Sequence, residues 1–333
     1  MRNYIKGLDY IRAFSILAIV FYHYTYQYEK SIGHVMHWNL NVSWGHMAVN
    51  TLFVLTAYLT IRNWDRRGFS FLYKRFVRLY PSFIICIFIT TGFMYFFMPS
   101  RLCTIKDIII NFTMFPNQLG AKPVDGVYWA LSTEIIFYVM IMVFMQIKDE
   151  GKFIKCLFLW GCVSIIISLC GVYDFNNLII KCIRVFGVTE RSAPFIIGCL
   201  IALKQKMIKW NKLVPTLIVS SIAMLVSQGL KFTIWTLLWG CIIYVVVKKQ
   251  NSNGEQGENI ITRLASFISS ISYPLYLLHQ YIGYSIINML EHAGYVDEWI
   301  VLIPFLVSIL LAYLVHRYIE VPSSKFLLSR KGI

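Results

Sequence analysis

The sequence predicts an all-α protein that crosses a membrane many times. Of its 333 residues, 58% are hydrophobic and 14% are charged, whereas a typical soluble domain has about 25% charged residues. The mean hydropathy is +0.62. The apolar residues gather in windows close to the ~20 residues that a helix needs to cross about 30 Å of hydrocarbon. Because the polar stretches between the windows are short, we expect one polytopic domain over residues 1–333.

Ten apolar windows are candidate transmembrane helices. They cover residues 10–28, 46–62, 81–98, 128–147, 153–171, 193–204, 213–229, 232–247, 267–289 and 299–316. Basic residues collect in the cytoplasmic loops of membrane proteins. With the N-terminus in the cytoplasm, 23 of the 31 Lys and Arg residues fall on the inner side and 8 on the outer side. We therefore expect both termini in the cytoplasm, and a flexible cytoplasmic connector at the polar segment 250–263.

The charge and the cysteines limit the possible partners. The net charge of +15 follows from the same cytoplasmic bias, so we expect the lipid bilayer as a partner and no nucleic acid. The eight cysteines form no CxxC pair and no Cys/His cluster with zinc spacing. The sequence therefore predicts no disulfide and no metal site, and it leaves the oligomeric state open.

The first window carries two ionisable residues on one helical face. Arg12 and His23 are eleven residues apart, which is close to three full turns at about 100° per residue. Ionisable groups in hydrocarbon cost free energy and usually face protein or water, where they have a function. We interpret the pair as part of a polar stripe that lines a cavity. A snorkelling anchor for Arg12 and a structural hydrogen bond for His23 stay open.

Glu134, in the fourth window, is expected at the same membrane depth as His23. A helix that enters from outside near residue 127 brings Glu134 about 10 Å below the outer surface. A carboxylate beside an imidazole sets its tautomer and stabilises the imidazolium, as a general base requires. We therefore predict a His23–Glu134 dyad. The alternative is a buried ion pair that only holds helices together.

The ninth window contains a further polar group in "ISSISYPLYLLHQ", residues 268–280. Tyr276 and His279 lie in this span. Pro274 has no backbone N–H and can leave local backbone hydrogen bonds unformed. His279 is a candidate for a second catalytic group, a substrate contact or a structural histidine. The residue types alone do not separate these roles.

A basic segment, "FLYKRFVRLYP" at residues 71–81, precedes the third window. On a helix, Lys74 and Arg78 share a face and Arg75 flanks it. Guanidinium groups match phosphate oxygens, and Tyr80 is one of the aromatic residues that can stack on a base. The segment is thus a candidate nucleotide-binding site, with ordinary positive-inside charge as the alternative.

Together these motifs resemble the membrane-bound acyltransferase-3 family. The matching segments are "LDYIRAFSILAIVFYHY", "FLYKRFVRLYPSF", "WALSTEIIFY" and "ISYPLYLLH". The resemblance implies a multi-pass O-acyltransferase of the bacterial cytoplasmic membrane. Such an enzyme moves an acyl group, usually acetyl from acetyl-CoA, to a hydroxyl of a cell-surface polysaccharide or lipid-linked glycan.

The resemblance also implies roles for the singled-out residues. His23, oriented by Glu134, would take the proton from the acceptor hydroxyl, or would carry the acyl group transiently. The acyl-CoA site would comprise Arg12, Lys74, Arg75, Arg78 and Tyr80, and the carbohydrate site Tyr138, Tyr276 and His279. One alternative is a transporter or flippase of a lipid-linked glycan, since polar groups inside spans also form transport paths. The other is acyl transfer to a small molecule.

One position departs from the family pattern. After "LFVL" in the second window, the family usually has Ser-Gly, whereas this chain has Thr56-Ala57. Threonine keeps the hydroxyl, but alanine removes the close backbone approach that glycine allows. We therefore expect altered packing there rather than altered chemistry.

Overall fold

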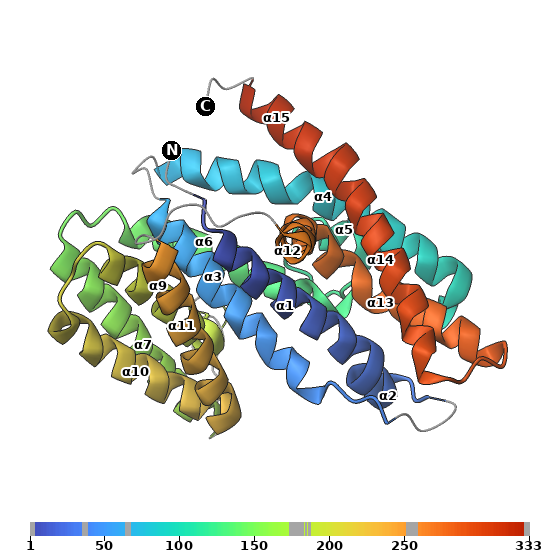
Figure 1. Cartoon of the computed structure of the whole chain (residues 1–333), viewed down its shortest axis with the longest axis horizontal. Coiled ribbons are helices and arrows are strands. Elements are labelled where there is room, and N and C mark those ends of the chain that lie inside the picture. Colours follow the sequence, from blue (N-terminus) through green and yellow to red (C-terminus); the bar gives the residue numbers. More distant parts are fainter. Residues whose placement is uncertain are drawn as a thin grey trace. The chain divides into compact units, whose positions relative to one another are not determined.

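The computed structural model describes residues 4–34, 39–63, 68–172, 183, 185, 188–250 and 259–329. In this part of the chain every regular element is helical, which confirms the predicted class (Figure 1). Most of the expected connector at 250–263 lies outside the described residues.

The chain forms two compact units. Unit 1 comprises Met1–Arg12, Val49–Leu72 and Thr133–Thr262, and unit 2 comprises Ala13–Ala48, Tyr73–Ser132 and Arg263–Ile333. Each unit is assembled from three separate stretches of sequence, so the two units are not consecutive domains.

Unit 1 is built around the short helix α9. Its main helices are α3 (Ala48–Arg62), α6 (Trp129–Phe144), α7 (Glu150–Val172), α9 (Ser192–Gln205), α10 (Trp210–Gln228) and α11 (Leu230–Gln250). Every residue of α9 from Ser192 to Leu203 is buried, and α7, α10 and α11 all pack against it. A helix that is apolar all round is typical of such a central position.

A glycine brings α9 close to α3. A Cβ atom added to Gly198 would overlap the carbonyl oxygen of Val54, and it would lie 2.7 Å from Cβ of Ala57 and 2.9 Å from the backbone nitrogen of Tyr58, closer than side chains approach. The close approach that we expected Ala57 to remove is therefore present, with the glycine on the opposite helix. Gly198, which has no side chain, thus allows the two helices to approach closely although position 57 carries an alanine.

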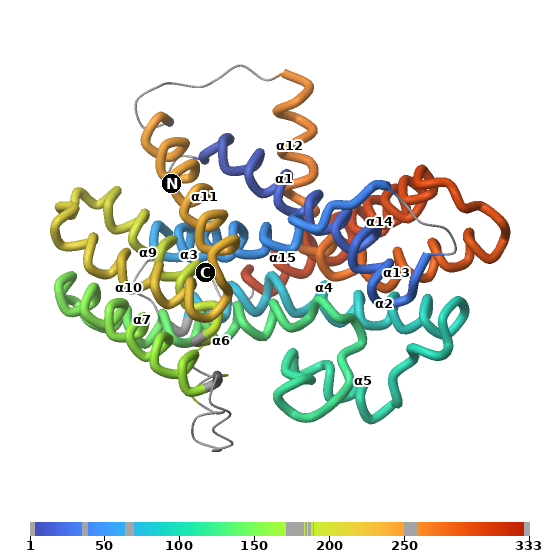
Figure 2. Tube along the Cα trace, turned by 90° about the horizontal axis from the view of Figure 1, so that it is seen from below, coloured from blue at the N-terminus to red at the C-terminus, as the bar shows by residue number. Residues whose placement is uncertain are grey.

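Unit 2 contains the remaining helices. They are α1 (Lys6–Tyr22), whose first half belongs to unit 1, α2 (Tyr28–Ser31), α4 (Gly68–Phe97), α5 (Ile105–Asn111), α12 (Ile260–Ser270), α13 (Ser272–His292), α14 (Leu302–Val315) and α15 (Val321–Ser329). Two π-helical turns interrupt them, η1 (His23–Gln27) after α1 and η7 (His316–Glu320) after α14. Helices α13 and α14 lie side by side (Figures 1 and 2). The core of the unit includes Ile16, Tyr24, Leu275 and Tyr284.

Six helices of the described chain are long and apolar enough to cross a membrane. They are Ser70–Phe97, Gly126–Phe144, Glu150–Cys170, Trp210–Gln228, Leu230–Lys249 and Glu298–Ser329. All six overlap expected windows.

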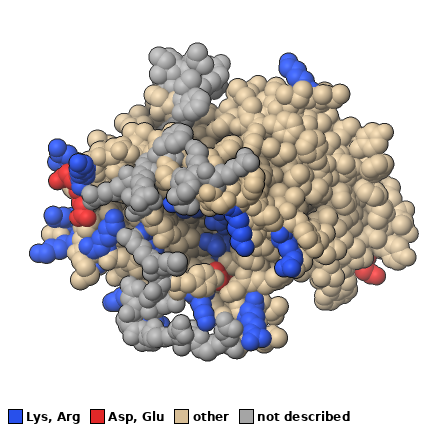
Figure 3. All heavy atoms as spheres, turned by 90° about the horizontal axis from the view of Figure 1, so that it is seen from above, with Lys and Arg blue, Asp and Glu red and all other residues tan. Residues whose placement is uncertain are grey.

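On the face that Figure 3 shows, Lys and Arg side chains outnumber those of Asp and Glu.

The other four expected windows are helical but shorter or more polar, so the count of ten is not confirmed. Helices α3 and α9 have 15 and 14 residues, about 21–23 Å at 1.5 Å per residue. The windows around α1 and α13 contain Arg12 and His279, which lower their hydropathy. These polar residues belong to the candidate site described next.

Candidate functional site

Two histidines from distant parts of the sequence meet inside unit 2. His23 is the first residue of η1, directly after α1, and His279 lies in α13. Nε2 of His279 is 3.1 Å from Nδ1 of His23, and the ring centroids are 4.8 Å apart. His279 is fully buried, whereas His23 is partly exposed.

Backbone carbonyls set the direction of this hydrogen bond. Nδ1 of His279 is 2.9 Å from the carbonyl oxygen of Tyr276 and 3.1 Å from that of Leu275, so this nitrogen carries a hydrogen. In neutral His279 the other nitrogen, Nε2, is then an acceptor. Nδ1 of His23, which is also 2.9 Å from the carbonyl oxygen of Ile19, is therefore the donor.

This arrangement leaves one nitrogen of His23 available for chemistry. When Nδ1 carries the hydrogen of a neutral imidazole, Nε2 has a lone pair. Within the described residues, Nε2 of His23 forms no hydrogen bond, and the side chain is partly exposed. A base in this state can accept a proton from a bound hydroxyl group.

The turn that begins with His23 is anchored by the next residue. The ring of Tyr24 lies against Gly283 of α13, where a Cβ atom would overlap it. The Tyr24 hydroxyl is 2.8 Å from the hydroxyl of Ser308 on α14. Since π-helical turns are frequent at functional sites, the position of His23 at such a turn is consistent with a catalytic role.

Asp125, which the sequence analysis did not single out, attaches the start of the fourth window to α13. Its carboxylate accepts hydrogen bonds from the backbone N–H groups of Val127 and Tyr281, both at 3.1 Å. Burial outweighs these two bonds and raises the pKa of Asp125 to about 7. The hydroxyl of Tyr276 also bonds to this segment, at 3.1 Å from the carbonyl oxygen of Val127.

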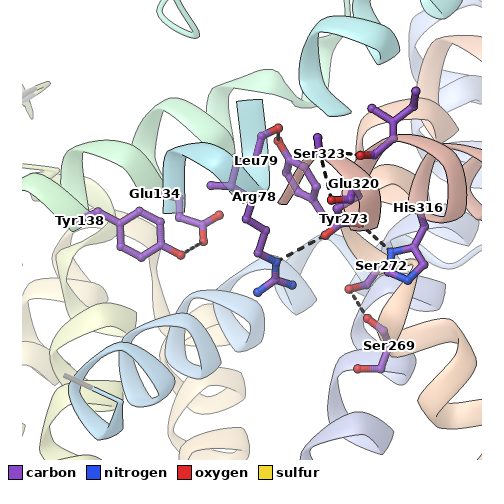
Figure 4. Close-up of polar contacts among 11 residues, drawn as sticks. Arg78, Leu79, Glu134, Tyr138, Ser269, Ser272, Tyr273, His316, Glu320 and Ser323 are labelled. Carbon is purple, nitrogen blue, oxygen red and sulfur yellow. Dashed lines mark hydrogen bonds and ion pairs between the residues drawn. The ribbon is translucent and has the colours of Figure 1, made fainter. Parts of the chain in front are cut away.

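Glu134 has two hydroxyl donors within unit 1. The hydroxyl of Tyr138, one turn further along α6, donates to its carboxylate (Figure 4). The hydroxyl of Thr56 lies 3.4 Å from the same oxygen. The threonine that replaces the family's serine thus keeps its hydroxyl beside Glu134. Because His23 belongs to unit 2, its pairing with Glu134 stays a prediction.

The basic residues of the expected nucleotide site lie on one helix, as predicted. Helix α4 begins at Gly68 and continues past Pro81, so Lys74, Arg75 and Arg78 are all helical. Lys74 and Arg75 are partly exposed. Arg12 lies on α1 in unit 1, so its membership of this site stays a prediction.

Arg78 contacts a carboxylate of the last helical segment. Its Nε atom is 3.4 Å from Oε1 of Glu320, whose other oxygen accepts a 2.8 Å hydrogen bond from His316 (Figure 4). The Arg78 side chain is 49% exposed, whereas that of Glu320 is 6% exposed. The guanidinium group is thus anchored at one nitrogen and open to solvent.

An aromatic pair accompanies these cations. The rings of Phe76 and Tyr80 stack with centroids 4.5 Å apart, and Phe76 is 54% exposed. Exposed rings next to guanidinium groups fit a nucleotide, whose base stacks and whose phosphates bind cations. For metals, no group of three or more His, Cys, Asp or Glu side chains within the described residues could hold an ion.

Comparisons with known proteins identify the family. The family model described as acyltransferase domain matches residues 5–317. The O-acetyltransferase OatA of Staphylococcus aureus strain NCTC 8325 / PS 47 is 24% identical over 393 aligned residues, which cover 99% of this chain and 60% of the relative. A putative O-acetyltransferase of strain COL is also 24% identical, with 97% of this chain and 58% of the relative covered.

This chain therefore spans about 60% of the length of the curated relatives that it matches. No solved structure matches it. Since the family model covers nearly the whole sequence, the chain belongs to the acyltransferase-3 family.

Proposed function

We propose that this protein transfers an acetyl group from acetyl-CoA to a hydroxyl of a cell-surface carbohydrate, with His23 as the general base. The family match and the relatives named O-acetyltransferase support transfer of an acetyl group to oxygen. The observation that most supports His23 is its hydrogen bond to His279, which leaves Nε2 as a lone-pair acceptor.

In the proposed reaction, Nε2 of His23 takes the proton of the acceptor hydroxyl while its oxygen attacks the thioester carbonyl carbon. The carbon–sulfur bond then breaks, and the proton passes from His23 to the departing thiolate of coenzyme A. A sugar hydroxyl is a poor nucleophile at neutral pH, and general-base assistance contributes about 10²–10⁴-fold. In the alternative scheme, Nε2 of His23 attacks the thioester and carries the acyl group transiently. Rapid quenching with labelled donor would detect this acyl-histidine as label bound to the protein.

His279 has a positioning role in this scheme. When His23 is protonated at Nε2, its Nδ1–H still donates to the neutral Nε2 of His279 and to the Ile19 carbonyl oxygen. Both contacts stabilise the imidazolium and hold the ring in one orientation. In the proposed scheme, the negative charge of the Glu134 carboxylate stabilises the His23 imidazolium. Tyr138 and Thr56 are the hydrogen-bond donors to that carboxylate. Tyr138 and Tyr276 remain our candidates for contacts with the acceptor.

The acyl donor is proposed to bind along α4. Lys74, Arg75 and Arg78, together with Arg12, would contact its phosphate groups, and Tyr80 its adenine ring. The exposed guanidinium of Arg78 and the stacked Phe76–Tyr80 pair support this assignment.

The proposed topology has ten spans in a bacterial cytoplasmic membrane, with both termini in the cytoplasm. The basic residues on the expected inner side support it. Single cysteines at Ser31, Gly120 and Tyr295 should react with an impermeant reagent added outside. Cysteines at Gly68, Glu255 and Arg330 should react only after permeabilisation. Outside labelling at Gly68 would remove the donor site from the cytosol and contradict the proposal.

Activity is best tested in two settings. Purified protein in detergent should consume labelled acetyl-CoA when extracted surface glycan is added. Mass spectrometry of cell-surface glycans, with and without the gene, should show a shift of one acetyl group. If the glycans are unchanged and the protein does not turn over acetyl-CoA, the proposed reaction is wrong and a transporter becomes the better account.

A further inference from the structure

A cavity in unit 2 lies apart from the histidine pair. It has a volume of about 610 Å³ and is formed by α12, the end of α14, η7 and α15. Its lining residues are Phe267, Ser270, Tyr313, His316, Arg317, Tyr318, Val321, Pro322 and Lys325. Ligand pockets are commonly about 300–1,000 Å³, so this one has room for a small ligand or a lipid headgroup.

The cavity is positively charged. Arg317 and Lys325 line it, both are exposed, and neither forms an ion pair within the described part of the chain. No acidic residue is among the lining residues. The four elements that form the cavity contain one acidic residue, Glu320, which is buried and bonded to Arg78 and His316 (Figure 4). The two cations therefore lack a carboxylate partner there and attract an anion.

Aromatic rings flank the two cations. The rings of Phe267 and Tyr313 are 6.0 Å apart at their centroids, and the Tyr318 side chain is 64% exposed. Tyrosine beside Lys and Arg is the combination found where transmembrane helices pass the headgroup region. An anion bound here would have apolar surface next to it, which suits an amphiphile better than a free phosphate ion.

The last helical span is longer than the hydrocarbon core, and both cations of the cavity lie past the end of the expected membrane window. The span Glu298–Ser329 has 32 residues, about 48 Å at 1.5 Å per residue, whereas the hydrocarbon core is about 30 Å thick. About a third of this length must therefore lie outside the hydrocarbon. The tenth expected window ends at residue 316, so Arg317, Tyr318, Val321, Pro322 and Lys325 lie past its end, whereas Tyr313 and His316 lie at its end.

We propose that this cavity binds the headgroup of an anionic phospholipid. Arg317 and Lys325 contact the phosphate, and the rings of Phe267, Tyr313 and Tyr318 lie beside the glycerol and the first acyl carbons. Basic pockets between transmembrane helices bind anionic headgroups in this way. The proposal does not depend on the acyl-transfer reaction or on which side of the membrane the C-terminus lies.

The test is lipid binding by the delipidated full-length protein in detergent. Native mass spectrometry would follow the addition of phosphatidylglycerol or phosphatidylcholine. Wild type should bind phosphatidylglycerol more tightly than phosphatidylcholine. The double variant Arg317→Gln/Lys325→Gln should weaken phosphatidylglycerol binding by roughly 30-fold, from about 1 kcal/mol for each basic residue near an anionic surface.

Two controls make the result specific. Arg317→Lys/Lys325→Arg keeps both charges and should bind like wild type. Lys248→Gln/Lys249→Gln removes two charges from α11, neither of them a lining residue, and should also bind like wild type. Equal binding of the two lipids, equal binding by Arg317→Gln/Lys325→Gln, or displacement of phosphatidylglycerol by coenzyme A would each overturn the proposal. The last result would identify a soluble nucleotide as the ligand.

Discussion

Nδ1 of His23 lies 3.1 Å from Nε2 of His279, a contact between the first helical segment of the chain and α13, 256 residues further along. Both donors point the same way: Nδ1–H of His23 donates to Nε2 of His279, and Nδ1–H of His279 donates to the backbone carbonyls of Leu275 and Tyr276. Nε2 of His23 therefore keeps its lone pair. His279 and the Ile19 carbonyl thus both favour the His23 tautomer with its hydrogen on Nδ1, and the pairing of His23 with Glu134 stays a prediction.

His279→Ala should lower kcat for acetyl transfer by roughly 10- to 100-fold, because the base loses its orientation but keeps its nitrogen. The KM for acetyl-CoA should not change. His279→Gln offers an amide oxygen near the position of Nε2 and should restore part of kcat. Steady-state kinetics of the three proteins would check this. Unchanged kcat in His279→Ala would show that the contact has no part in catalysis.

Glu134→Gln should reduce kcat while leaving measurable activity, because it removes charge rather than the base. Tyr138→Phe deletes the hydroxyl that donates to Glu134 and should have a smaller effect in the same direction. Parallel turnover measurements at saturating acetyl-CoA would rank the two variants. A Glu134→Gln protein that is folded and has no activity would mean that the carboxylate does more than orient.

Arg75→Ala and Arg78→Ala should each raise the KM for acetyl-CoA by roughly 10- to 100-fold, since a charge-assisted hydrogen bond contributes about 1.5–3 kcal/mol. Lys106→Ala, which removes an exposed side chain of α5, is the matched control and should leave KM unchanged. Glu320→Gln separates donor binding from anchoring, because it removes the ionic partner of Arg78 but keeps the guanidinium. If Glu320→Gln and Arg78→Ala raise KM equally, Arg78 acts through Glu320 and not through the donor.

Gly198→Ala should destabilise the protein by about 1–3 kcal/mol, because the new methyl group overlaps α3. Adding Ala57→Gly removes only the 2.7 Å contact with the Ala57 methyl group. The contacts with the Val54 carbonyl oxygen and the Tyr58 nitrogen remain, so it should recover only a small part of the loss. Thermal unfolding in detergent would measure both. Gly92→Ala is the control, since nothing lies within 4 Å of its added Cβ. Equal melting temperatures for Gly198→Ala and Gly92→Ala would contradict the close packing.

The sequence predicted the parts of the structure that depend on local pattern. Apolar windows identified the helical class and the six helices long enough to span a membrane. The spacing of Lys74 and Arg78 identified a shared helical face, and α4 does contain both. Hydropathy did not identify α9 as a buried helix of 14 residues, because an apolar segment looks the same whether protein or lipid surrounds it.

Contacts between distant segments were harder to predict. His279 was singled out with three roles open, but its contact with His23 was not predicted, because periodicity carries no information about a residue 256 positions away. The same reason explains why Gly198 was missed as the compensation for Ala57. Asp125 was missed because it lies just before an apolar window, where a single carboxylate resembles an ordinary loop residue. The carboxylate's signal is its burial, which only the folded chain reveals.

The most direct test of the account is the turnover of acetyl-CoA by His23→Ala in the presence of acceptor glycan. Acetyl-CoA binding and thermal unfolding should be measured on the same preparation. We expect kcat to fall by about 10²–10⁴-fold, the usual contribution of a general base, with unchanged acetyl-CoA affinity and an intact fold. Near-full turnover by His23→Ala, together with an inactive but folded His279→Ala, would contradict the account and assign the base to His279.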